Sequence, residues 1–129
     1  RTPSYLSLES ALAHHGVLSQ LPAEWTLVTT GSPRTFQALG QTFTYHHIQR
    51  PYFLGFEEHG TLLVALAEKA LLDLVYLRVR RRRTLTGNRL LSLLDDMDPG
   101  SLDPDLLHRY AVLMHLEPWI TRLMPHATG

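Results

Sequence analysis

The chain has 129 residues, 44% of them hydrophobic, and twelve Lys and Arg balance twelve Asp and Glu, so its length fits one domain and its net charge excludes no class of partner. The absence of cysteine excludes a disulfide scaffold and a thiolate zinc site. No apolar run reaches the roughly 20 residues of a membrane helix and no signal peptide is visible, so we expect a cytoplasmic protein without membrane contact.

The first half of the chain predicts one short helix followed by strands. Ser7 suits an N-cap and Glu9 suits the first turn, so we expect a helix over Leu8–His15 that stops at Gly16. Aromatic and β-branched residues predict strands over Trp25–Thr30, Gln41–Gln49 and Thr61–Val64, with a short extended piece over Tyr52–Glu57 and a turn at His59–Gly60.

The second half changes to helical periodicity. Apolar residues recur on one face over Leu66–Arg82, which predicts a largely buried central helix. Its narrow polar stripe consists of Lys69, Asp73, Tyr76 and Arg80. Further helices are expected over Asn88–Met97, from Pro104 (capped by Asp103) to about Leu116, and over Glu117–Met124.

The order helix, strands, helices indicates the α+β class. We therefore expect a single domain over residues 1–129 in which a small, mainly antiparallel sheet is packed by a central buried helix and further C-terminal helices.

Eight histidines, including the pairs His14–His15 and His46–His47, raise the question of a metal site. Neighbouring residues on a strand point to opposite faces, and His14 and His15 lie about 100° apart on a helix. The spacing therefore favours half-buried, hydrogen-bonded histidines over metal ligands, and we expect no metal.

Glu68, Lys69 and Asp73 allow an acid–base or nuclease interpretation and a structural one. Glu68 suits the dipole of the helix start, and Lys69 with Asp73 forms an i,i+4 pair worth a few tenths of a kcal/mol on a surface. The cluster Asp95, Asp96 and Asp98 shows no sign of converging on a metal with them, and no P-loop or G-x-S-x-G motif is present. We expect no catalytic residue, no cofactor and no small-molecule substrate.

Six of the eleven arginines fall in one short basic segment. These candidate nucleic-acid-binding residues are Arg78, Arg80, Arg81, Arg82, Arg83 and Arg89. Arginine forks grip phosphate oxygens, but the same residues also suit a solvated helix end neutralised by the nearby aspartates. The two interpretations remain open, and four consecutive charges suffice only for weak, salt-sensitive binding without sequence readout.

Three stretches together resemble the C-terminal domain of the AbiEi antitoxin family. They are Tyr5–Leu12 with His15-Gly16, Thr29–Arg34 with Phe43–Ile48, and Phe53–Phe56 with Ala65–Leu74. The resemblance covers about Ser4 to Leu77, and the order and spacing of the pieces make it fairly specific. One departure is Leu66-Ala67, where the family often has Ser or Thr followed by Pro, which removes a side-chain N-cap.

The resemblance implies an antitoxin and transcriptional regulator of a bacterial type IV toxin–antitoxin system, a form of phage defence. Its expected partner is the genetically paired nucleotidyltransferase-like toxin, without an assumed stable complex. DNA is a second expected partner, because the family's basic surface is implied to aid operator binding. The family's N-terminal winged helix has no counterpart in these residues. The motif positions, as a surface for antitoxicity, are Ser7, Glu9, Ser10, Glu68, Lys69 and Asp73.

Two rival hypotheses accompany this one. An autonomous basic module that binds nucleic acid through the arginine segment is the first, and it predicts affinity that falls steeply with salt. A metal-dependent hydrolase built on the His or Asp clusters is the second, and it requires stoichiometric bound metal.

Overall fold

The computed structural model describes residues 3–19, 21–80 and 94–123 of the chain. Its strands are β1 (Ser4–Leu6), β2 (Trp25–Thr29), β3 (Arg34–Ala38), β4 (Gln41–His47), β5 (Phe56–His59) and β6 (Leu62–Ala65). Its helices are α1 (Leu8–His14), α2 (Ala67–Arg80), α4 (Pro104–Leu113) and α5 (Glu117–Leu123), with short 3-10 turns η1 (Arg50–Tyr52) and η2 (Pro99–Ser101).

The six strands form one mixed sheet in the order β3-β4-β2-β1-β6-β5. The pairs β1·β2, β3·β4 and β5·β6 are antiparallel, whereas β1·β6 and β2·β4 are parallel. The α+β class is confirmed, although the sheet has more strands than predicted. Its two edges are hairpins, and the chain crosses from one hairpin to the other between β4 and β5.

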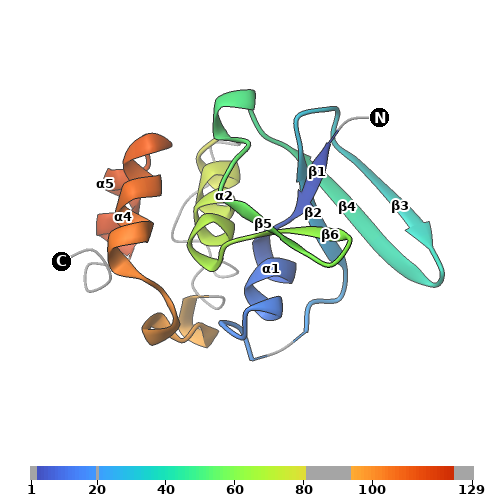
Figure 1. The fold of residues 1–129 in the computed structure, drawn as a ribbon, viewed down its shortest axis with the longest axis horizontal. Coiled ribbons are helices and arrows are strands. Elements are labelled where there is room, and N and C mark those ends of the chain that lie inside the picture. The colour runs from blue at the N-terminus through green and yellow to red at the C-terminus, as the bar shows by residue number, and fades with distance from the viewer. Residues whose placement is uncertain (1–2, 20, 81–93, 124–129) are drawn as a thin grey trace.

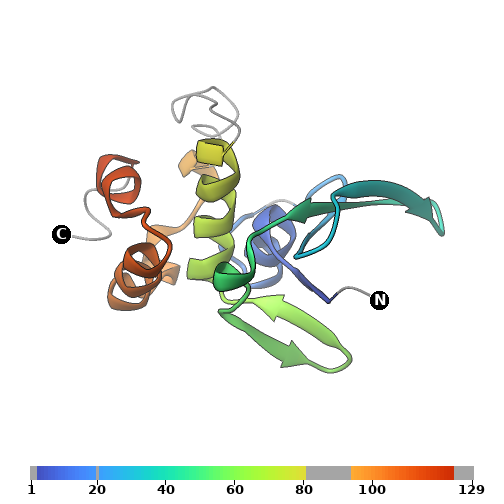
Figure 2. The same ribbon diagram turned by 90° about the horizontal axis from the view of Figure 1, so that it is seen from above.

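Helix α2 is the central helix, as predicted, and lies between α1 and α4 (Figure 1). Its fully buried apolar residues are Ala70, Leu71, Leu72 and Val75. Seen from above, the β3–β4 hairpin extends away from all of these helices, while α4 and α5 lie on the far side of α2 (Figure 2). No helix among the described residues is long and apolar enough to cross a membrane.

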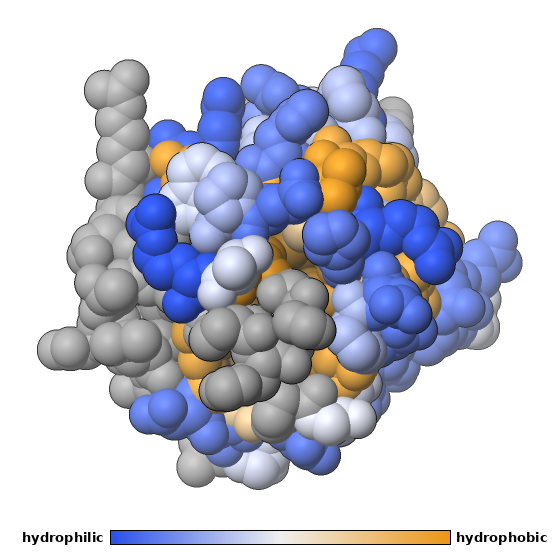
Figure 3. Space-filling view, turned by 90° about the vertical axis from the view of Figure 1, so that its left-hand side faces the viewer, coloured by the Kyte–Doolittle hydropathy of each residue, from blue (hydrophilic) through white to orange (hydrophobic). Residues whose placement is uncertain are grey.

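Figure 3 shows the side of the molecule that carries α4 and α5. In Figure 3, hydrophobic areas on this side are separated by hydrophilic residues. Val112 and Leu113 of α4 are large apolar side chains that stand exposed here.

Strand β3 was not predicted, and the reason lies in its turn. Leu39 and Gly40 join β3 to β4 with φ angles of 53° and 74°, so both central residues are left-handed, as in a type I′ hairpin. Asn-Gly or Asp-Gly usually signals this turn, and a leucine at the first position does not. Strand β1, only three residues long, was also missed.

The predicted helices differ from the observed ones mainly at their ends. Helix α2 begins at Ala67 despite the missing Ser-Pro cap, and its predicted end at Arg82 lies outside the described residues. Most of the predicted helix Asn88–Met97 also lies outside them, and residues 94–96 are helical. Helix α4 ends at Leu113, before the predicted Leu116.

The start of α1 is capped by a neighbouring strand. Ser7 occupies the N-cap position, as predicted, but its hydroxyl makes no cap hydrogen bond. Thr26 of β2 takes that role, because its Oγ1 accepts from the Ser10 amide at 3.1 Å and donates to the Ser7 carbonyl at 2.6 Å. The Ser10 hydroxyl in turn accepts from the Thr26 amide at 2.9 Å. Two reciprocal hydrogen bonds between Ser10 and Thr26 therefore attach α1 to β2.

We expect Thr26→Val to lower the free energy of unfolding by about 1–2 kcal/mol, the usual cost of a lost helix cap. Valine keeps the β-branched shape of threonine but leaves the buried Ser10 amide without its acceptor. Urea denaturation measures the effect. The control is Thr35→Val on exposed β3, which should change stability by less than about 0.5 kcal/mol. Equal effects at the two positions would contradict the cap.

Candidate functional site

The motif positions do not form the predicted surface. Glu9 is half-buried, and the other five are buried, namely Ser7, Ser10, Glu68, Lys69 and Asp73. The surface prediction is therefore wrong, because Lys69 and Asp73 of α2 face β1 and the start of α1 rather than water. The estimate of a weak, solvent-exposed Lys69–Asp73 pair is wrong for the same reason, since both side chains are 0% exposed.

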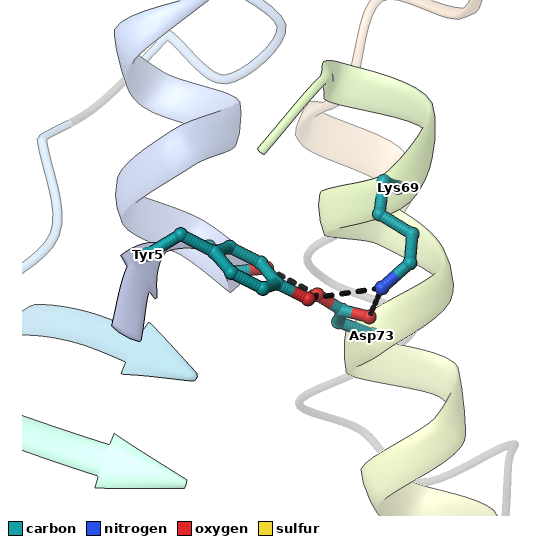
Figure 4. A network of polar contacts seen from close by, with 4 residues as sticks. Tyr5, Lys69 and Asp73 are labelled. Atoms are coloured by element: carbon teal, nitrogen blue, oxygen red, sulfur yellow. Dashed lines mark hydrogen bonds and ion pairs between the residues drawn. The ribbon is translucent and has the colours of Figure 1, made fainter. Parts of the chain in front are cut away.

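Four side chains from three segments make one buried polar network (Figure 4). The Lys69 ammonium donates to Oδ1 of Asp73 and, at 2.9 Å, to the Tyr5 hydroxyl. The Tyr5 hydroxyl and the Ser7 hydroxyl each donate to Oδ2 of Asp73 at 2.8 Å. The carboxylate thus has three donors, which is how a charge is retained inside a protein.

Aromatic rings and a glycine enclose this network. The Tyr5 ring lies 4.8 Å from the Phe56 ring and 5.1 Å from the Phe53 ring, between centroids. Gly55 lies against the Lys69 stem, and a Cβ at that position would be 2.8 Å from Lys69 Cγ. With φ of +76°, Gly55 also has a backbone conformation that favours glycine.

Burial dominates the proton affinities of the network. Loss of water raises the pKa of the Tyr5 hydroxyl, and the neighbouring Asp73 charge raises it further. Burial likewise raises the pKa of Asp73 and lowers that of Lys69, while the attraction between the two opposes both changes. None of the four groups is exposed, and their hydrogen bonds join β1, the start of α1 and α2.

Glu68 links α2 to α4. One carboxylate oxygen, Oε2, accepts from the Asp103 amide at 2.8 Å. The Asp103 side chain in turn accepts from the amides of Asp105 and Leu106, as predicted for the cap of α4. Glu68 therefore connects α2 to the start of α4, and it also places an acidic side chain in the first turn of α2.

The structure describes only part of the arginine segment. Arg78 is half-buried and Arg80 is exposed at the C-terminal end of α2. The other four candidates, Arg81, Arg82, Arg83 and Arg89, lie outside the described residues. The choice between phosphate binding and a solvated helix end therefore stays a prediction.

The histidines make hydrogen bonds to different partners. His14 Nε2 lies 2.9 Å from His59 Nδ1, whereas His15 Nε2 lies 2.7 Å from the Ala65 carbonyl oxygen. Slight burial and the neighbouring His15 and His59 lower the pKa of His14. His47 Nδ1 lies 2.9 Å from the Gly31 carbonyl oxygen. Among the described residues, no group of three or more His, Asp or Glu side chains is arranged to hold a metal ion.

Two aspartates of the acidic cluster accept hydrogen bonds from different loops. Asp96 accepts from the Ser19 hydroxyl at 2.6 Å, and Asp98 accepts from the Ser101 hydroxyl at 3.0 Å. Asp95 is exposed. These carboxylates serve local structure in two different places.

A row of aromatic side chains across strands β2, β4 and β3 was missed by the sequence analysis. It consists of Trp25, Phe43, Phe36 and Tyr45, with Arg34 beside it. The residues come from three strands, and one of these strands was not predicted. The alternation of Arg34, Phe36 and Ala38 is the signal that could have indicated it.

Comparisons of the chain with protein-family models, with curated proteins and with solved structures find no match.

We expect Asp73→Asn to lower the free energy of unfolding by about 3–5 kcal/mol, because the Lys69 ammonium would remain buried without its counter-charge. The double variant Lys69→Met with Asp73→Asn should lose less than the sum of the two single variants, since no unpaired charge remains. Urea denaturation of the four proteins measures the coupling. A loss of only a few tenths of a kcal/mol in Asp73→Asn, as for an exposed pair, would contradict the buried network.

Gly55→Ala should destabilise the protein more than Gly40→Ala, by at least about 1 kcal/mol. Both glycines have left-handed φ angles, +76° and +74°, so both substitutions carry the same backbone strain. A Cβ at Gly40 meets nothing within 4 Å, whereas one at Gly55 meets the Lys69 stem. Thermal denaturation of the two variants measures the loss of stability that the contact with Lys69 adds. Equal melting temperatures would contradict the prediction, because they would show that the Lys69 side chain moves aside without cost.

Proposed function

We propose that the chain is an antitoxin domain of the AbiEi type, which counteracts a nucleotidyltransferase-like toxin without catalysing a reaction. The observation that supports this most is the meeting of the motif stretches. Tyr5 and Ser7 come from the first stretch, Gly55 from the third stretch's opening, and Lys69 with Asp73 from its end. Residues of the first and third motif stretches, which lie far apart in the sequence, are thus in contact in the folded chain.

In this proposal the motif residues act through the fold. The Lys69–Asp73 pair, Tyr5 and Ser7 lie in the interior, so contacts with a partner belong to exposed residues elsewhere. Such a domain works in the cytoplasm beside its toxin, and a stable toxin complex is not required. Assistance to operator binding would come from the basic end of α2, where Arg80 is exposed.

The test is rescue of cells that express the toxin encoded beside this chain's gene. We expect the 129-residue chain to restore survival. The double variant Lys69→Met with Asp73→Asn should also restore survival wherever it is folded, as judged by circular dichroism, because the motif serves the fold alone. The single variant Asp73→Asn should fail in proportion to its loss of folded protein.

One outcome would overturn the antitoxin function, and another would overturn the claim that the motif serves the fold alone. A soluble, folded chain that does not restore survival would reject the antitoxin function of this domain. A folded double variant that fails while the unchanged chain succeeds would instead place the buried pair in the neutralisation itself. Protein levels measured in the same cells separate both outcomes from simple loss of the chain.

An autonomous nucleic-acid-binding module is the second candidate, and the observation that favours it is the basic C-terminal end of α2. In that case Arg81→Ala with Arg82→Ala would weaken binding to all sequences alike, because phosphate contacts carry no base information. Unchanged binding in that variant would reject the second candidate without affecting the first.

A further inference from the structure

The β3–β4 hairpin and the neighbouring strand β2 together carry an open row of nearly parallel aromatic rings. Between centroids, Trp25 lies 6.3 Å from Phe43, Phe43 lies 5.3 Å from Phe36, and Phe36 lies 5.7 Å from Tyr45. The angles between successive ring planes are only 11°, 13° and 17°. We call these four residues the aromatic row.

Strand register places the whole row on one face of the sheet. Trp25 and Phe36 are both paired with Phe43, from the strands on either side of β4, and Tyr45 lies two residues further along β4. Neighbouring strands lie about 4.8 Å apart, so the row from β2 to β3 spans roughly 10 Å. That length has room for two or three stacked bases, the number that comparable sheet aromatics bind.

The row is open to solvent although aromatic side chains usually lie in a core. Trp25 and Phe36 each retain 39% of their exposure, and the hairpin extends away from the helices (Figure 2). Phe43 and Tyr45 are half-buried, with part of their surface against the core. The Trp25 and Phe36 rings are therefore accessible to a ligand, while the half-buried Phe43 and Tyr45 rings hold the row in place.

Arg34 is the one Asp, Glu, Lys or Arg residue of strands β2, β3 and β4. The Arg34 guanidinium lies 5.2 Å from the Tyr45 ring centroid and 5.4 Å from that of Phe36. Strands β2, β3 and β4 contain no Asp or Glu. Glu24, just before β2, directs its carboxylate to the Thr44 hydroxyl at 2.8 Å, and Thr44 alternates with the aromatic row on β4 and so occupies the opposite face.

We propose that the aromatic row with Arg34 binds single-stranded nucleic acid. Open aromatic rings stack with bases of any sequence, and a guanidinium held beside them attracts the phosphate backbone. A duplex does not fit this chemistry, because its bases already stack on one another inside the helix. The inference does not rest on the antitoxin function, and it concerns a surface separate from the arginine segment of α2.

The experiment uses the tryptophan in the row as its reporter. The chain has two tryptophans, so Trp119→Phe leaves Trp25 as the only one. This protein is titrated with oligo(dT) or oligo(U) of about 12 nucleotides in about 50 mM salt. We expect saturable quenching of Trp25 fluorescence by single strands, and none by a duplex of the same length.

Matched variants on one strand separate stacking from other effects. Phe36→Ala should weaken single-strand binding by about tenfold, the usual effect of losing one stacking ring. Gln37→Ala is the control, because Gln37 is the next residue on exposed β3 and lies on the opposite face. Arg34→Ala should reduce the slope of log affinity against log salt by about 0.7, the change expected for one lost phosphate contact.

The contrary results are equally distinct. Absence of quenching by both oligonucleotides, or equal affinities for Phe36→Ala and Gln37→Ala, would overturn the proposal. Quenching by the duplex as strong as that by single strands would also overturn it. If light scattering shows an oligomer that Phe36→Ala dissociates, the row is an interface between copies, since Trp, Tyr and Arg also favour protein contacts.

Discussion

The structure depends on pairing the charges of Lys69 and Asp73, which both lie out of contact with water. Removing two such ions from solvent costs several kcal/mol each, and their attraction offsets that cost only in close geometry with further hydrogen bonds. The Tyr5 and Ser7 hydroxyls supply those bonds. The first strand, the start of α1 and the central helix must therefore reach their places together.

This requirement extends to residues outside the network. The Ser7 hydroxyl donates to Asp73 and makes no cap hydrogen bond, and Thr26 of β2 caps α1 in its place. At the other side of α2, Glu68 holds the amide of Asp103 and so fixes the start of α4. A series of specific polar bonds thus joins β2, α1, α2 and α4 within an otherwise apolar core. Such bonds select one arrangement more sharply than apolar packing does, because a displaced partner leaves a buried polar group unsatisfied.

The same arrangement separates the interior from the surfaces that can meet a partner. The motif residues of the network lie in the interior. The β3–β4 hairpin and the α4–α5 pair lie at opposite ends of the molecule, with α2 between them (Figure 1). The hairpin presents rings and a guanidinium, and the described end of α2 presents arginine. An antitoxin domain and a single-strand-binding hairpin are compatible on one chain, because they use different residues.

The sequence by itself determined the elements whose signals are local. Helical periodicity indicated α2, Asp103-Pro104 indicated α4, and β-branched and aromatic residues indicated β2 and β4. Only the tertiary structure decided that Lys69 and Asp73 are buried, because an i,i+4 pair has the same spacing in water and in a core. It also decided the aromatic row, since β3 brings Phe36 beside Phe43 through a Leu-Gly turn that carries no standard signal. Local propensity fixes which segments are regular, but the partners of each side chain follow from contacts between residues far apart in the chain.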